Sequence, residues 1–148
     1  MDSIYETLMA LPLFNGVSRS RILQMAEATK FHFLKFSDKE PIIDAGEECT
    51  HVKFIISGKA KVTISNSDGR FKVSQVLEAP DVIAPDFLFG RDTHYPCSAT
   101  AIGDTGILQI TKAEYVEILN SDKIFLYNLL NRLSMNAQKA IDGVLALT

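Results

Sequence analysis

The sequence predicts a mainly β domain of the α+β class, in which a small antiparallel jelly roll carries flanking helices and is followed by one long helix. Short apolar runs with a period of two lie between turn signals over residues 30–110. Helical periodicity precedes them over residues 1–29, and a stretch nearly free of Gly and Pro follows over residues 111–148. A chain of 148 residues can bury the core of one domain, and we expect a single domain.

The composition is that of an ordinary soluble protein, with 47% hydrophobic and 22% charged residues and a formal net charge of −3. This balance predicts no basic surface of the kind that holds DNA. The N-terminal run has an acid where a signal peptide is basic, and no apolar run approaches the ~20 residues of a membrane span. Two cysteines, Cys49 and Cys97, are too few for a disulfide scaffold. We therefore expect a cytoplasmic protein with reduced thiols and no membrane contact.

The first third of the chain is predicted to contain short helices. Ser18 is a suitable N-cap for the helix predicted in "VSRSRILQMAEATK". Its apolar stripe consists of Ile22, Leu23, Met25 and Ala26. The preceding "LPLFNG" contains two helix breakers and predicts a turn that docks Leu13 and Phe14 on the core.

Six runs with strand-like composition follow. They are "KFHFLKF", "HVKFIIS", "KAKVTIS", "RFKVSQVLE", "CSATAI" and "GILQI". The second and third are expected to join at Ser57-Gly58, the third and fourth at an Asp68-Gly69 hairpin, and the last two across "GDTG". With shorter pieces between them, these runs predict seven or eight short antiparallel strands.

Two helices are predicted at the C-terminal end. Thr111 and Glu114 form the capping box of the first. The second runs from Asp122 for roughly 26 residues, or about 39 Å. Its apolar residues at alternating steps of four and three form a heptad seam of Leu126, Leu130, Leu133, Ala137, Ala140, Val144 and Leu147. The stripe could pack on the chain's own barrel, but Phe125 and Leu129 on a second face can do so instead, so we expect the seam to pair two copies in a homodimer.

This order of short helices, strands and one long helix resembles the sensor domain of the catabolite activator protein and its Crp/Fnr relatives. The resemblance covers roughly residues 10–145 and is carried by "FSDKEPIIDAGEECTHVKFIISGKAKVTISNSDGR", with tight turns at Gly46-Glu47, Gly58 and Asp68-Gly69. It implies that the jelly roll is a β-roll, an antiparallel double-stranded β-helix, and that the long helix dimerises. It also implies a small-molecule effector, and DNA contact only through a helix-turn-helix domain that this chain does not contain.

In that family, a Gly-Glu pair holds the ribose of a cyclic nucleotide and an Arg neutralises its phosphate. The resemblance places these positions on Ala84-Pro85 and on Cys97. Pro85 has no side chain that accepts a hydroxyl, Cys97 is neutral, and Asp86 would repel a phosphate. The site is therefore expected to be degenerate for cyclic AMP. No cofactor is predicted, although a cyclic nucleotide is disfavoured rather than excluded.

Other groups in the same segment could still contact an effector, among them Arg91 from the loop and the hydroxyls of the strand. The candidate effector residues are Ala84, Pro85, Asp86, Phe87, Leu88, Arg91, Cys97, Ser98, Ala99, Thr100 and Asn136. Asn136 lies where the family's long helix reaches the base, and it is either a ligand contact or a solvated residue. Cys97 is expected to be a small core residue, with a redox sensor or haem ligand as the alternative.

The remaining polar residues predict no chemistry of their own. Arg132 and Lys139 are expected on a solvated helix face. The three histidines lack metal-ligand spacing, and Ser, His and Asp occur in no arrangement typical of a nucleophile with its base, so neither a metal site nor an enzyme is predicted.

The sequence thus predicts the sensor and dimerisation domain of a Crp/Fnr-type transcription regulator, under allosteric control by an unknown effector. The alternative is a stand-alone ligand-binding or protein-interaction module that does not bind DNA.

Overall fold

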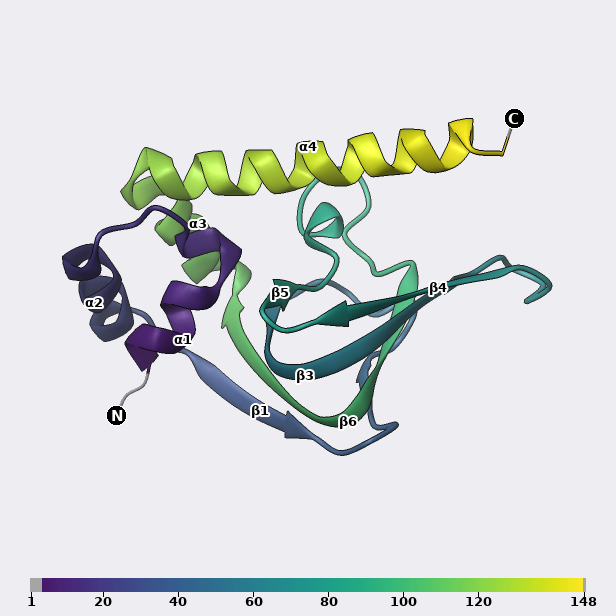
Figure 1. Ribbon diagram of the computed structural model, residues 1–148, viewed down its shortest axis with the longest axis horizontal. Coiled ribbons are helices and arrows are strands. Elements are labelled where there is room, and N and C mark those ends of the chain that lie inside the picture. The colour runs from purple at the N-terminus through teal and green to yellow at the C-terminus, as the bar shows by residue number, and fades with distance from the viewer. Residues whose placement is uncertain (1–3, 148) are drawn as a thin grey trace.

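The computed structural model describes residues 4–147 (Figure 1). Its N-terminal helices are α1 (Ile4–Ala10), the 3-10 turn η1 (Pro12–Phe14) and α2 (Arg19–Ala28). The strands are β1 (His32–Phe36), β2 (Pro41–Ile43), β3 (His51–Ser65), β4 (Lys72–Glu78), β5 (Asp81–Val82) and β6 (Cys97–Thr111). A second 3-10 turn, η2 (Pro85–Phe87), lies between β5 and β6, and the chain ends in α3 (Lys112–Ser121) and α4 (Lys123–Leu145).

The strands form one antiparallel sheet in the order β1-β6-β3-β4, in which β2 also pairs with β6 and β5 with β3. The two 15-residue strands β3 and β6 lie side by side and curl together, as Figure 1 shows, so that they wind the sheet into the expected roll. The predicted Asp68-Gly69 hairpin joins β3 to β4, and Gly69 has a φ of 73°.

The expectation of seven or eight short strands is wrong, because β3 and β6 are each continuous where two strands were predicted. Gly58 and Gly103 bend these strands with φ values of 80° and 70° but do not end them. The pairing register shifts on both sides of Ser57, which identifies the bend in β3 as a bulge. A Cβ at Gly58 would lie 2.4 Å from the carbonyl oxygen of Asp104, so only glycine fits this crossing.

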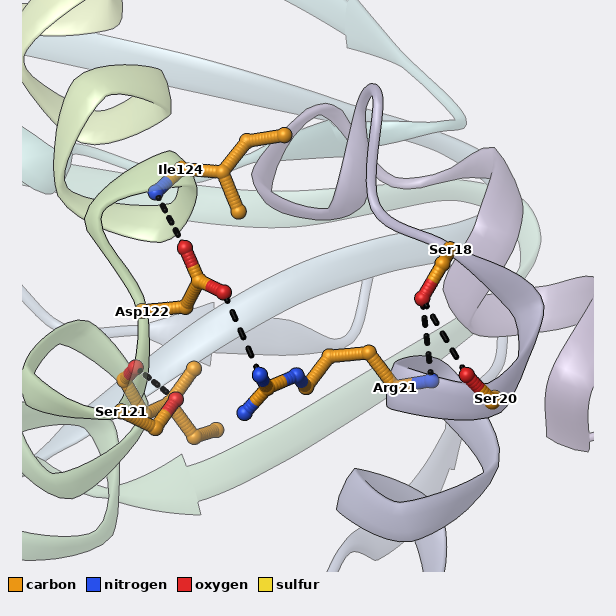
Figure 2. Close-up of polar contacts among 7 residues, drawn as sticks. Ser18, Ser20, Arg21, Ser121, Asp122 and Ile124 are labelled. Atoms are coloured by element: carbon orange, nitrogen blue, oxygen red, sulfur yellow. Dashed lines mark hydrogen bonds and ion pairs between the residues drawn. The ribbon is translucent and has the colours of Figure 1, made fainter.

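The helices begin at the caps that the sequence predicts. The hydroxyl of Ser18 accepts from the amide of Arg21 at the start of α2, and Thr111 with Glu114 forms the capping box of α3. Asp122 caps α4 and also pairs with Arg21 at 3.3 Å, so a single carboxylate ties α2 to the α3–α4 corner (Figure 2). These contacts fix the direction in which α4 leaves the roll.

Helix α4 lies across one side of the roll (Figure 1). Phe125 and Leu129 are buried, and the ring of Phe125 packs edge-on against Phe14 with centroids 5.4 Å apart, which confirms the predicted core-facing side. The predicted length was too great: α4 has 23 residues and Leu147 lies beyond its end, 87% exposed. The amide of Leu147 bonds to the carbonyl of Val144 in a tighter turn that closes the helix. No helix within residues 4–147 is long and apolar enough to cross a membrane.

Candidate effector site

Residues 84–100, called the cradle here, connect β5 to β6 and include the first residues of that strand. The cradle begins with Ala84 in a left-handed conformation, at φ 47° and ψ 53°. The 3-10 turn η2 follows, in which the amide of Phe87 donates to the carbonyl of Ala84 at 3.3 Å. A left-handed backbone favours glycine, because the Cβ of other residues crowds the following carbonyl. The backbone of this turn therefore has a glycine-type geometry at a position that carries alanine.

The side chains of η2 divide between the core and the solvent. Pro85 and Leu88 are buried, Phe87 is half-buried and Asp86 is exposed. The turn therefore presents apolar groups to the roll and a carboxylate to the outside.

The strand part of the cradle alternates between the two faces of the sheet. Cys97 pairs with Ile64 and Ala99 with Val62, and both Cys97 and Ala99 are buried in the roll. Ser98 is the residue between them and therefore lies on the opposite face. Thr100 lies on that same outer face. The inner wall of the roll is thus apolar at this point, and the two hydroxyls predicted as donors lie on its other side.

The inner wall carries no positive charge at the position where the resemblance expects one. Burial raises the pKa of the Cys97 thiol, and the nearby Cys49 raises it further, so the thiol is neutral at physiological pH. The prediction that Cys97 is a small core residue is confirmed. Arg91 is the single Lys or Arg between residues 84 and 100, and its side chain is exposed on the loop after η2. A phosphate in the roll would therefore be buried without a fixed cation, at a penalty of several kcal/mol.

Polar side chains of helix α4 contact the cradle and the neighbouring strand β5. The side-chain nitrogen Nδ2 of Asn136 donates to Oδ1 of Asp86 at 2.7 Å. One turn earlier, Arg132 forms an ion pair with Asp81 of β5, whose carboxylate also accepts from the amide of Val82. Arg132 is only 23% exposed, so the expectation of a solvated face is wrong for this residue. Asp81 lies 51 positions earlier in the sequence, too far for helical spacing to indicate the pair.

A third polar contact extends this row. The side-chain nitrogen Nδ2 of Asn128 donates to the backbone carbonyls of Leu13 and Asn15 at 2.7 and 2.9 Å. Asn128, Arg132 and Asn136 are four residues apart, so they occupy one face of α4, which we call the docking stripe. The docking stripe connects the helix to η1, β5 and η2 in turn.

The predicted seam lies on a different face of α4. Leu126, Leu130 and Val144 are exposed, and Leu130 exposes 48% of its surface. Leu133 is half-buried because it also packs against the core of the chain itself. The alanines at 137 and 140 are exposed as well. The helix thus has one face on the roll and a second apolar face open to solvent.

Comparison with known proteins gives the family. A family model described as the cyclic nucleotide-binding domain matches residues 33–122. The cAMP-activated global transcriptional regulator Vfr of Pseudomonas aeruginosa is 26% identical over 111 residues, which are 73% of this chain and 52% of Vfr. The chain therefore spans about half the length of this curated relative.

Two solved structures show the same fold. The catabolite activator protein of Thermus thermophilus matches with a TM-score of 0.79 at 18% identity, over 92% of this chain and 62% of that one. The sensor domain of the transcriptional regulator DNR from Pseudomonas aeruginosa matches with a TM-score of 0.74 at 18% identity, over 93% and 90% of the two chains. The predicted resemblance and fold class are confirmed. Since the family model matches more than half of the 148 residues, this protein belongs to the cyclic nucleotide-binding domain family and has the fold of the Crp/Fnr-type regulators.

Proposed function

We propose that this chain is the effector-sensing and dimerising part of a Crp/Fnr-type transcription regulator, and that its effector is not cyclic AMP. The cradle carries the proposal: its turn begins with Ala84 in a left-handed conformation that suits the glycine expected there, but the buried inner position where a cation is expected is a neutral thiol, Cys97. Asp86 adds a negative charge at the rim of the same turn. An anionic ligand would gain little there and would lose its hydration.

The docking stripe supplies the route by which an effector acts. Asn136 and Arg132 hold α4 against η2 and β5, so a ligand that moves either element changes the contacts of the helix. A ligand shifts such an equilibrium only as far as its affinities for the two positions of α4 differ. Contacts to Asp86 or Asp81 would provide that difference. We propose that the displaced α4 repositions a DNA-binding domain attached beyond residue 148.

The proposal assigns binding and allosteric roles to this chain and no catalytic step. Two copies would pair through the exposed seam of α4, and DNA would be contacted by the attached domain. A stand-alone module would use the same cradle and helix without DNA. The natural reading frame of the gene distinguishes the regulator from the stand-alone module. About 70 further residues that include a basic recognition helix would support a transcription regulator.

Calorimetric titration with cyclic AMP, supported by thermal-shift measurements with other cyclic mono- and dinucleotides, tests the cradle. We expect no saturable heat with cyclic AMP up to about 1 mM, whereas the cAMP-activated Vfr, titrated in parallel, gives a binding curve. The triple variant Ala84→Gly/Pro85→Glu/Cys97→Arg restores the family pattern and is expected to gain affinity. Micromolar binding by the parent chain would contradict the proposal. A variant that keeps its fold by circular dichroism but does not bind would contradict the assignment of these three positions.

A further inference from the structure

Two hollows meet at the docking stripe. The outer one is a groove of about 410 Å³ between α4 and the end of η1, within the size range of small-molecule sites. The inner one is a recess of about 20 Å³ between α4 and the roll, which admits one water-sized group. Pro12, Asn128 and Arg132 line both hollows, and Pro85 of the cradle lines the inner recess. The two hollows are therefore neighbours and lie beside the cradle.

Tyr115 of α3 lines the inner recess and has an unpaired hydroxyl. Only 2% of the residue is exposed, and its ring stacks against that of Phe89 with centroids 6.4 Å apart. Among residues 4–147 its hydroxyl has no hydrogen-bond partner, whereas that of the equally buried Tyr95 donates to the carbonyl of His51 at 3.4 Å. Burial raises the pKa of Tyr115, so the hydroxyl keeps its proton and is a donor at neutral pH. A buried donor of this kind indicates an acceptor from outside the described chain.

The polar groups of the groove are almost all uncharged. They are side chains of α4 and of the residue that ends η1, namely Asn15, Asn128, Asn131, Ser134 and Gln138. Arg132 is the one charged side chain among the described residues that line either hollow, and Asp81 of β5 pairs with it. Farther along α4, Lys139 and Asp142 carry charges that offset each other. An ion would lose its hydration without meeting an unpaired opposite charge, so the groove favours an uncharged ligand.

The lining of the groove suits a molecule with several hydroxyl groups. Asn131, Ser134 and Gln138 have no hydrogen-bond partner among residues 4–147, and each can both donate and accept, as a hydroxyl does. Pro12 and Met135 add apolar surface on which C–H groups can pack. A sugar or a cyclitol carries hydroxyls around a C–H face, so it complements both kinds of surface.

We propose that the groove binds a small uncharged polyol, and that one of its hydroxyl oxygens enters the inner recess and accepts from Tyr115. The ligand would contact η1 and α4 together and would favour the docked position of the helix. This consequence rests on the proposed function, because it makes the polyol the effector that acts through the docking stripe.

Titration of the ¹⁵N-labelled chain with D-glucose, D-ribose and myo-inositol tests the site by NMR. We expect saturable shifts of the side-chain amide signals of Asn15, Asn131 and Gln138 with at least one of the three, and a dissociation constant in the millimolar range or below. Glucose 6-phosphate and glucosamine, which add a negative and a positive charge, are expected to bind about tenfold more weakly than glucose. Absence of saturable shifts with all three polyols up to about 50 mM, or tighter binding of either charged sugar, would overturn the proposal.

Tyr115→Phe tests the inner recess separately from the groove. The variant is expected to keep its fold by circular dichroism and to bind the best polyol about tenfold more weakly, because it lacks the donor. Tyr127→Phe is the matched control, since Tyr127 is 61% exposed on α4 and lines neither hollow, and it should bind as the parent does. Equal affinities of the parent and Tyr115→Phe would contradict the pairing with Tyr115.

Amide hydrogen exchange of α4 tests the effector role of the same ligand. Saturation with the polyol is expected to slow exchange about tenfold over residues 128–138, because the ligand holds the docked helix. Binding without slower exchange would overturn the effector role of the polyol. Absence of binding would overturn the site itself and leave the proposed function to its own test with cyclic AMP.

Discussion

Two residues of the cradle, Ala84 and Cys97, determine different properties: the first concerns its backbone conformation and the second its charge. Ala84 has a left-handed backbone that suits glycine, at the position where the resemblance expects a glycine. Cys97 occupies the inner wall of the roll as a small neutral group, where a cation would be needed to hold a phosphate. A substitution at Ala84 therefore tests the backbone of the turn, and a substitution at Cys97 tests the charge of the inner wall.

Ala84→Gly is expected to stabilise the fold by about 0.5–1 kcal/mol. Relief of left-handed strain, about 1–2 kcal/mol, outweighs the greater freedom that glycine adds to the unfolded chain. Urea unfolding of both proteins measures the difference. The control is Ala113→Gly in the first turn of α3, at an exposed position, which is expected to lose up to about 1 kcal/mol. Equal losses at both positions would show that Ala84 is not strained.

Arg132→Met is expected to destabilise the chain by about 1–3 kcal/mol, because it leaves the largely buried carboxylate of Asp81 without its cation. The double variant Asp81→Asn/Arg132→Met should lose less than the sum of the two single variants, with a coupling energy of about 1 kcal/mol or more in urea unfolding. Lys139→Met, at an exposed position of the same helix, is the control and should change stability little. If the losses of unfolding free energy caused by the substitutions of Asp81 and Arg132 were additive, the two residues would not form a direct pair.

At the scale of the element, the sequence predicted most of what local rules determine. The caps at Ser18 and Thr111 depend on neighbouring residues, and the structure confirms both. The continuity of β3 and β6 could not be predicted, because Gly58 and Gly103 read as turns although their bends keep the pairing with the neighbouring strand. The cradle could be found only through resemblance, since its apolar wall forms when distant strands pair.

The capping box of α3 gives stability a defined pH dependence. The backbone amide of Thr111 donates to the carboxylate of Glu114 and lowers its pKa from the ordinary value of 4.5, and further bonds from the Thr111 hydroxyl and the Lys30 amide act in the same direction. A carboxylate with a lower pKa in the folded state stabilises the fold fully above the unfolded pKa. That stabilisation is lost as the pH falls through the folded pKa.

Glu114→Gln is therefore expected to destabilise the chain near pH 7 by roughly 0.5 kcal/mol, because Gln can still accept the capping bond but lacks the charge, and to have a progressively smaller effect below about pH 4.5. Unfolding free energies of both proteins at several pH values between 7 and 3 measure this convergence. Glu117→Gln, at an exposed position of the same helix, should show no such pH dependence. A Glu114→Gln penalty that stays constant down to pH 3 would exclude the carboxylate as its cause.

At the scale of the whole molecule, α4 has two faces that perform different tasks. Its docking stripe and buried aromatic face hold it on the roll, and its apolar seam remains exposed. Single apolar residues on a surface are ordinary, but a row of them at heptad spacing along one helix predicts a partner helix. Both faces belong to one helix, so the displacement of α4 proposed above is expected to move the seam as well.

Leu130→Glu is expected to convert a dimer into a folded monomer, because it buries a charge within the seam. Light scattering coupled to size exclusion measures the mass. Leu130 tests the seam better than Leu133, since Leu133 also packs on its own roll and its replacement would disturb the fold directly. Met135→Glu is the matched control: Met135 is as exposed as Leu130, lies on the same helix and is outside the seam, so the variant should remain dimeric. If the parent chain is itself monomeric at high micromolar concentration, or if both variants dissociate alike, the seam does not pair two copies, and the proposed effector response would have to act through the direction of α4 alone.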